Sequence, residues 1–294
     1  MTLSTGLPRR LVLTGLPAAA LAVLSGCTIA PPGSEQPDQQ GNPAAPTNPR
    51  GDVAITHIHR AVRDRDTILV ATHQGLFRFA GAGQLVAVGP PFDLMGFAIA
   101  PDGTYLASGH PAPDSDLPQP IGLIQSTDRG HTWTLRSRGG QSDFHALTAL
   151  GPGVMAFDDA LHFSPDRVDW QDRQIPAPPR DLAAGPDGTV LATTERGLLA
   201  SADRGLTWQT VSTPQLLVTV AWAGPRTIVG ASTTGALMVS RDAGATWKVG
   251  PRSVGDVSAI TATLLGAEQI EILLVVGTQV WRTNDLGAQT QILV

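Results

Sequence analysis

The residues best suited to chemistry are histidines in the first half of the chain. Five of the seven histidines, joined by one methionine, recur in matching positions of a repeated pattern. Imidazole nitrogen and thioether sulfur are ligand types for transition metals. The candidate ligands are His57, His59, His73, Met95, His110 and His145.

Met95 decides which metal such a site would prefer. A thioether beside imidazoles favours copper, whereas imidazoles with a carboxylate suit zinc. We therefore predict a metal site in which copper is favoured over zinc. The alternative, that these histidines are only hydrogen-bonded in a hydrated polar channel, stays open. No nucleotide cofactor is expected, because the chain has no P-loop and no dinucleotide-binding fingerprint.

Two carboxylates, Asp93 and Asp143, offer a different chemistry. A pair of carboxylates facing each other across a channel could hydrolyse a glycosidic bond. Only 5% of the residues are aromatic, which leaves few rings to stack against sugars. We therefore expect a binding protein rather than an enzyme, with a divergent glycosyl hydrolase as the alternative.

An eight-residue motif, Ser-x-Asp-x-Gly-x-Thr-Trp, begins at residues 126, 201 and 240, and decayed copies begin at 164 and 283. The motif suits a turn between two strands, because Asp caps the turn, Gly takes a positive φ and Trp covers the hairpin. The residues at the four main positions are Ser126, Asp128, Gly130 and Trp133; Ser201, Asp203, Gly205 and Trp208; and Ser240, Asp242, Gly244 and Trp247.

The motif resembles the Asp box, or BNR repeat, of sialidases, sortilin-like proteins and a photosystem assembly factor. The chain is thus similar to β-propeller lipoproteins described as glycosyl hydrolase or exo-sialidase-like. The resemblance covers residues 55–294 and implies a β-propeller fold. It does not extend to the tyrosine nucleophile and arginine triad of sialidases. The single tyrosine, Tyr105, falls in a predicted strand, and no Arg-Ile-Pro motif occurs.

The spacing of turns divides the chain into units of four short strands. Units begin near residues 55, 93, 143, 178, 216 and 257. We predict an all-β fold, a six-bladed β-propeller over residues 53–294, with seven blades as the alternative. In the fourth unit the strands are expected at 180–184, 189–193, 198–200 and 207–211.

The turns also predict where the candidate ligands lie. Met95 and His145 each precede a glycine- and proline-containing turn by six residues, and His59 takes the same position in the first unit. These side chains should converge on the top face of the propeller, the face formed by the starts of the innermost strands. His57, Asp93 and Asp143 come two residues earlier, on the same side of each strand. His73 and His110 fall in turns on the same face.

The N-terminus has the features of an export signal. Arg9 and Arg10 precede an apolar run that ends in Leu24-Ser25-Gly26-Cys27, a sequence that resembles a lipobox. We predict a lipoprotein signal peptide over residues 1–26, lipidation of Cys27 and a proline-rich flexible tether over residues 27–52. The protein would be lipid-anchored to the outer, or periplasmic, side of the bacterial cytoplasmic membrane. The choice between the general and the twin-arginine export route stays open.

The composition limits the kinds of partner that the protein could bind. The formal net charge is −5, with 20 basic and 25 acidic residues, which argues against a nucleic-acid partner. One cysteine excludes a framework of disulfides. We expect a monomer that contacts the membrane through its lipid anchor and binds a metal ion or a protein partner at its top face.

Overall fold

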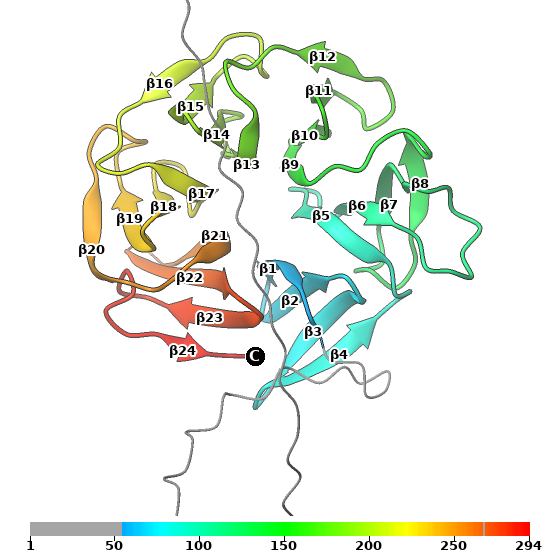
Figure 1. The fold of residues 1–294 in the computed structure, drawn as a ribbon, viewed down its shortest axis with the longest axis horizontal. Helices are drawn as coiled ribbons and strands as arrows, with labels where there is room; N and C mark the ends of the chain where they lie inside the picture. Colours follow the sequence, from blue (N-terminus) through cyan, green and yellow to red (C-terminus); the bar gives the residue numbers. More distant parts are fainter. Residues whose placement is uncertain (1–54, 267) are drawn as a thin grey trace, which may run out of the picture. The chain divides into compact units, whose positions relative to one another are not determined.

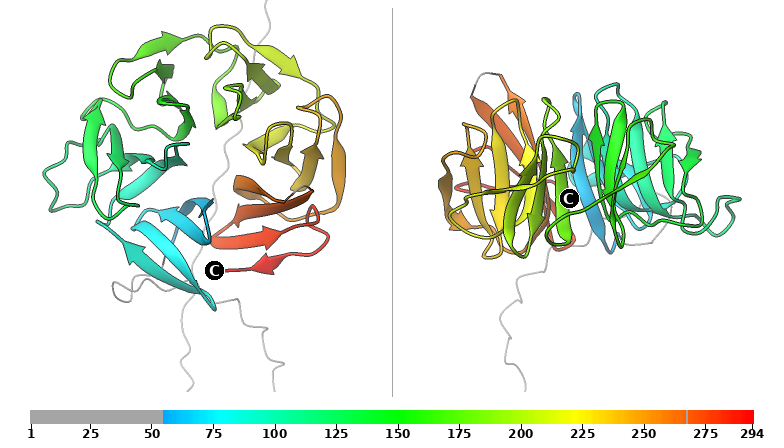
Figure 2. Two further views of the ribbon diagram at one scale, coloured as in Figure 1. Left: turned by 180° about the vertical axis from the view of Figure 1, so that it is seen from behind. Right: turned by 90° about the horizontal axis from the view of Figure 1, so that it is seen from above.

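The computed structural model describes residues 55–266 and 268–294, which form six four-stranded antiparallel sheets. The sheets stand like blades around a central axis, as Figure 1 shows from one side and Figure 2 from behind and edge-on. This confirms the predicted six-bladed β-propeller. The predicted signal peptide, Cys27 and the whole of the predicted tether lie outside the described residues and remain predictions.

Each blade is one continuous stretch of chain, and its first strand lies nearest the axis. The first three blades consist of β1 (Ile58–Asp64), β2 (Thr67–Thr72), β3 (Gly75–Gly81) and β4 (Gln84–Val88); β5 (Asp93–Ile99), β6 (Tyr105–His110), β7 (Leu123–Ser126) and β8 (Thr134–Ser137); and β9 (Ala146–Leu150), β10 (Gly153–Phe157), β11 (Leu161–Ser164) and β12 (Gln171–Arg173).

The other three blades repeat this order. They consist of β13 (Pro179–Ala184), β14 (Val190–Thr194), β15 (Gly197–Ser201) and β16 (Gln209–Val211); β17 (Leu217–Trp222), β18 (Ile228–Ser232), β19 (Ala236–Ser240) and β20 (Lys248–Ser253); and β21 (Val257–Leu265), β22 (Gln269–Val276), β23 (Gln279–Thr283) and β24 (Gln291–Ile292). The four strands predicted in the fourth unit are confirmed to within two residues at each end.

The core lies between the blades rather than inside a single sheet. Between the first two blades, Ala71 and Leu76 pack against Phe97 and Tyr105, all of them buried. Because both faces of a blade are covered by neighbours, the middle strands are apolar on both sides; β18, for instance, is buried along its whole length. The hydroxyl of Tyr105 donates to Asp64 of the first blade at 2.5 Å, so this tyrosine lies between the two blades.

The repeated motif forms the turn between the third and fourth strands. In the copy at 201–208, Asp203 accepts hydrogen bonds from the amide of Thr207 at 2.9 Å and from its hydroxyl at 2.6 Å, while the amide of Gly205 donates to Ser201 at 2.8 Å. Arg204 and Gly205 both have positive φ. The copies at 126 and 240 make the same bonds. The motif is therefore a structural turn.

The ring closes where the last blade meets the first. Among the described residues, no sheet contains strands from both of these blades. Side-chain contacts therefore close the ring. Ile58 and Phe77 of the first blade pack against Leu273 and Val280 of the last. The guanidinium of Arg63 forms two hydrogen bonds with a carboxylate of the last blade, that of Glu271. No described helix has the length and hydrophobicity needed to cross a membrane.

A candidate metal site on the top face

A β-bulge occurs at the same place in the innermost strand of five blades. The register shifts after Ile58 in β1, and equivalent shifts occur in β5, β13, β17 and β21. The residues at the bulges are His59, Met95, Arg180, Val218 and Ser258. His145 directly precedes β9 in the third blade. The predicted register match between His59 and Met95 is therefore correct.

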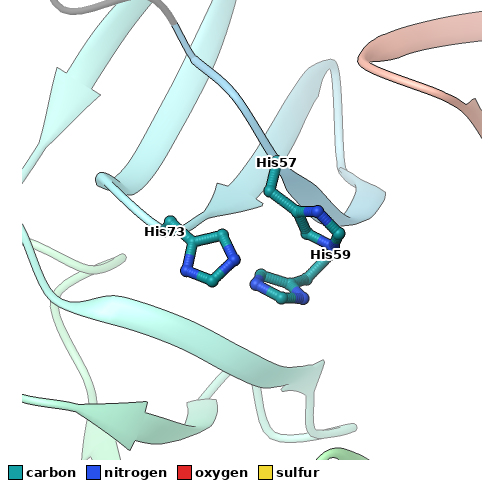
Figure 3. A group of neighbouring side chains, drawn as sticks. All are labelled: His57, His59 and His73. Carbon is teal, nitrogen blue, oxygen red and sulfur yellow. The ribbon is translucent and has the colours of Figure 1, made fainter. Parts of the chain in front are cut away.

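Three histidines of the first blade gather at the top face. His57 directly precedes β1, His59 is the second residue of β1, and His73 lies in the turn between β2 and β3, so their rings lie side by side (Figure 3). Ring centroids are 4.6 Å apart for His57 and His59, 4.9 Å for His57 and His73, and 4.6 Å for His59 and His73. One ligand nitrogen of each ring lies within 4.8 Å of the other two.

Asp93, the first residue of β5, orients this cluster from the second blade. Its Oδ2 lies 2.7 Å from Nδ1 of His73, a short hydrogen bond. Its Oδ1 lies 3.6 Å from Nε2 of His59, which is an ion-pair distance but too long for a hydrogen bond. With Nδ1 of His73 occupied by the carboxylate, Nε2 of the same ring remains as its ligand atom. Such a carboxylate–histidine pair commonly supports a bound metal.

Two buried polar atoms in this cluster have no hydrogen-bond partner: Nε2 of His59 and Oδ1 of Asp93. Buried polar atoms are nearly always paired with protein, water or an ion. These two atoms therefore lack a hydrogen-bond partner at the place where the His59 imidazole and the Asp93 carboxylate approach each other.

The electrostatics of the cluster favour neutral histidine at His57. Burial lowers the pKa of His57, and the neighbouring charges of His59 and His73 lower it further, while Asp93 acts in the opposite direction. For Asp93 itself, burial alone would raise the pKa, but the two histidines more than offset this and lower it. These directions favour an ionised Asp93 beside a neutral His57, and the neutral imidazole is the form in which a histidine binds a metal.

The cluster opens into a small cavity at the mouth of the channel. This cavity of about 180 Å³ is lined by His57, His59, Met95, His145 and Arg180, among others. Its lining also includes two residues that form an ion pair across the channel, Arg60 and Asp181, at 2.8 Å. The sequence analysis did not detect this pair, because nothing in the sequence shows which residues of the first and fourth blades face each other.

The structure brings together three of the six predicted ligands, and it places the other three nearby. His57, His59 and His73 form the cluster, and Met95 and His145 line the cavity beside it. His110 lies at the end of β6, where its Nε2 approaches Asp143 Oδ2 at 3.2 Å. His145 Nε2 lies 2.9 Å from the same oxygen, which accepts a hydrogen bond from it. The five histidines thus lie in two groups, and Met95 lines the cavity beside the first of them.

Asp93 and Asp143, the carboxylates of the hydrolase alternative, are both engaged by histidines. The other two histidines lie away from these groups. His131 lies in the turn motif of the second blade, and His162 of β11 contacts Asp158 and Asp172.

Comparison with known proteins supports the fold and not a specific activity. No protein-family model matches the chain, and no curated protein matches its sequence. Solved structures similar to it include virginiamycin B lyase from Staphylococcus aureus, with 12% identity, a TM-score of 0.54 and coverage of 81% of this chain and 84% of that one.

Two further solved structures are also similar to the chain. A GH74 enzyme from Niastella koreensis has 18% identity and a TM-score of 0.52, with coverage of 80% of this chain and 37% of the enzyme, so the described propeller corresponds to little more than a third of it. YCF48 from Cyanidioschyzon merolae has 14% identity and a TM-score of 0.50, with coverage of 80% of this chain and 83% of that one. At these identities the likeness establishes a β-propeller of this general type.

Proposed function

We propose that this protein binds a transition-metal ion through His57, His59 and His73, at the mouth of its propeller channel. The observation that carries this proposal is the convergence of three imidazoles, with one ligand nitrogen of each within 4.8 Å of the other two. Ligand nitrogens around one metal ion lie about 3–3.5 Å apart when metal–nitrogen distances are about 2.0–2.1 Å. Side-chain movements of about 1–2 Å would therefore close the site.

Copper is the metal we favour. Three imidazoles can bind copper or zinc, so the choice depends on a further ligand. Met95 lines the cavity into which the cluster opens, and its thioether is a soft ligand for Cu(I) and a poor one for zinc. The cavity leaves room for a fourth ligand, because His57 and His59 form only one part of its lining.

The setting of this metal site would be extracytoplasmic. The lipobox-like sequence that ends in Cys27 supports export and lipid anchoring, and the proline-rich segment that follows would act as a tether. A tethered copper-binding propeller would sequester or deliver copper outside the cytoplasm.

Titration of the full-length protein with Cu(I) tests the proposal. We expect one copper per chain, and no detectable binding to the double variant His59→Ala/His73→Ala. His131→Ala is the matched control, because it removes an exposed imidazole from one of the turn motifs, which the cluster does not use. Equal binding by the wild-type protein and the double variant, or no binding by either at micromolar copper, would show that the proposal is wrong.

Two further variants test the role of Asp93 and the preference for copper. Asp93→Asn should weaken copper binding by about 10–100-fold, as is typical when a carboxylate that orients a metal-bound histidine is removed. Met95→Leu should weaken the binding of Cu(I) but leave the binding of zinc unchanged. If Met95→Leu affects neither metal, the preference for copper loses its basis while the histidine site stands.

A further inference from the structure

The copy of the turn motif in the last blade has no tryptophan. In the fifth and sixth blades, Lys248 and Gln291 each pair with the residue that directly precedes the motif, so these two residues hold equivalent places. Trp247 directly precedes Lys248, and Thr290 directly precedes Gln291. Thr290 therefore stands where the other copies have their tryptophan.

In the other copies this ring packs between its own blade and the one before it. Trp247 and Ala200 of the fourth blade pack against one hydrophobic cluster, which includes Ile228 of the fifth. Trp133, Trp170 and Trp208 pack in the same way at the three corresponding blade interfaces. The sixth blade lacks this ring on the side that faces the fifth.

A hollow of about 470 Å³ lies at this interface, between the blades β17–β20 and β21–β24 (Figure 1). Its lining includes Val239 and Ile272. Val239 directly precedes the motif of its blade, as Ala200 does, and Ile272 pairs with the first motif residue, as Ile228 does. The hollow is thus bounded by the counterparts of the residues that share a cluster with Trp247.

The hollow has an apolar floor and a basic rim. Ile270 and Ile272 are buried apolar residues of its lining, whereas Arg241 and Lys248 in the same lining are exposed. Sites for small molecules have volumes of about 300–1,000 Å³ and are mostly apolar with a few polar groups. This hollow fits that description.

The charge at the rim suits an anion. The carboxylate that lines the hollow, that of Asp285, accepts hydrogen bonds from the hydroxyl of Thr283 and the amide of Gln289, both at 2.9 Å, within its own turn. Two cations, Arg241 and Lys248, therefore stand against one carboxylate that is already engaged.

The chain itself offers no free ring to fill the hollow. Residues 1–54 contain no phenylalanine, tyrosine or tryptophan. In the part of the chain that the structure describes, every aromatic side chain is buried or half-buried, so a second copy would have none to insert. An aromatic occupant must therefore come from another molecule.

We propose that the hollow between the fifth and sixth blades binds a small aromatic carboxylate. Its ring would contact Val239, Ile270 and Ile272, in the place that tryptophan takes in other blades, and its carboxylate would face Arg241 and Lys248. This site shares no residue with the proposed metal site at the channel mouth, so each can fail without the other.

Binding of indole-3-propionate to the full-length protein, measured by isothermal titration calorimetry, tests the proposal. We expect one molecule per chain with a Kd below about 1 mM. Thr290→Trp should abolish this binding, because the new ring would fill the hollow, and it should leave copper binding unchanged. Thr290→Ser is the matched control, since it leaves the hollow open and should bind the probe as the wild-type protein does.

A second variant tests the role of charge and serves if Thr290→Trp does not fold. The double variant Arg241→Ala/Lys248→Ala changes only exposed side chains. It should weaken the binding of indole-3-propionate about tenfold, as expected for the loss of two exposed charge contacts, and leave the binding of neutral indole unchanged.

Four results would overturn the inference. The first is no binding of indole-3-propionate by the wild-type protein at 1 mM, about the weakest affinity expected. The second is equal binding by Thr290→Trp and Thr290→Ser. The third is unchanged binding of the acid by the double variant. The fourth is binding of an acidic tryptophan-containing peptide without binding of the free acid, which would make the hollow a docking site for a partner protein.

Discussion

The ion pair at the cavity mouth allows a quantitative test of how the channel is held together. Asp181 in β13 accepts a hydrogen bond from Arg60 of the first blade, two from the hydroxyl of Thr219 and the amide of Val220 in the next blade, and one from the amide of Leu182. The side chains of Asp181 and Arg60 are 7% and 18% exposed. One carboxylate therefore links three blades in a largely dry environment.

Replacing Asp181 with Ala leaves the Arg60 guanidinium and two backbone amides without their acceptor. Removal of one partner from a buried ion pair typically costs about 3–5 kcal/mol, so we expect a loss of unfolding free energy in that range. Arg60→Ala should cost less, about 1.5–3 kcal/mol, because it removes one charged hydrogen bond and the carboxylate keeps its other three donors. The double variant should show that the two losses are not additive.

Urea unfolding measures these losses. The slope of the unfolding free energy against urea concentration should be the same for all variants, so that differences in midpoint report stability. Asp187→Ala is the matched control in the same blade, where an exposed carboxylate caps a turn by accepting from Thr189 at 2.9 Å. It should cost about 1 kcal/mol. If Asp181→Ala costs no more than Asp187→Ala, or if Arg60→Ala costs more than Asp181→Ala, the reasoning from buried contacts is wrong.

Three other predictions concern the turn motif and the anchor. Trp208→Phe should cost less than Trp247→Phe in urea unfolding, because Nε1 of Trp247 donates to the motif glycine at 3.2 Å whereas Nε1 of Trp208 makes no hydrogen bond; equal losses would contradict this. The hydrogen bonds in each of the three intact motifs lower the pKa of its carboxyl group, that of Asp128, Asp203 or Asp242, from the ordinary 3.8 to about 2. Because the unfolded chain then binds more protons, stability should fall as the pH drops from about 4 to 2, and Asp203→Asn should make this fall less steep. Cys27→Ala should release the protein from the membrane fraction, and unchanged partition would refute the lipid anchor.

The architecture could be predicted from the sequence because its signals are local. A Ser-x-Asp-x-Gly-x-Thr-Trp turn needs its residues within eight positions, and the three intact copies make the same bonds in the structure. The same holds for the register of His59 and Met95, since the distance from a turn sets which residue reaches the bulge.

The grouping of the histidines was decided only by the tertiary structure. Sequence analysis placed six ligands on one face as a single set, whereas the blade geometry separates His57, His59 and His73 from His110 and His145. What separates them is the contact of Asp93 with one group and of Asp143 with the other, across two different blade interfaces.

What the sequence by itself determined is therefore the type of unit and the face on which its polar residues lie, because both follow from turns and from the alternation of side chains along a strand. What only the tertiary structure decided is which carboxylate meets which histidine, and that Arg60 pairs with Asp181 from a blade on the other side of the channel. Those contacts depend on how the closed ring brings residues from separate blades together. The spacing of residues along the chain does not show which side chains of different blades will meet.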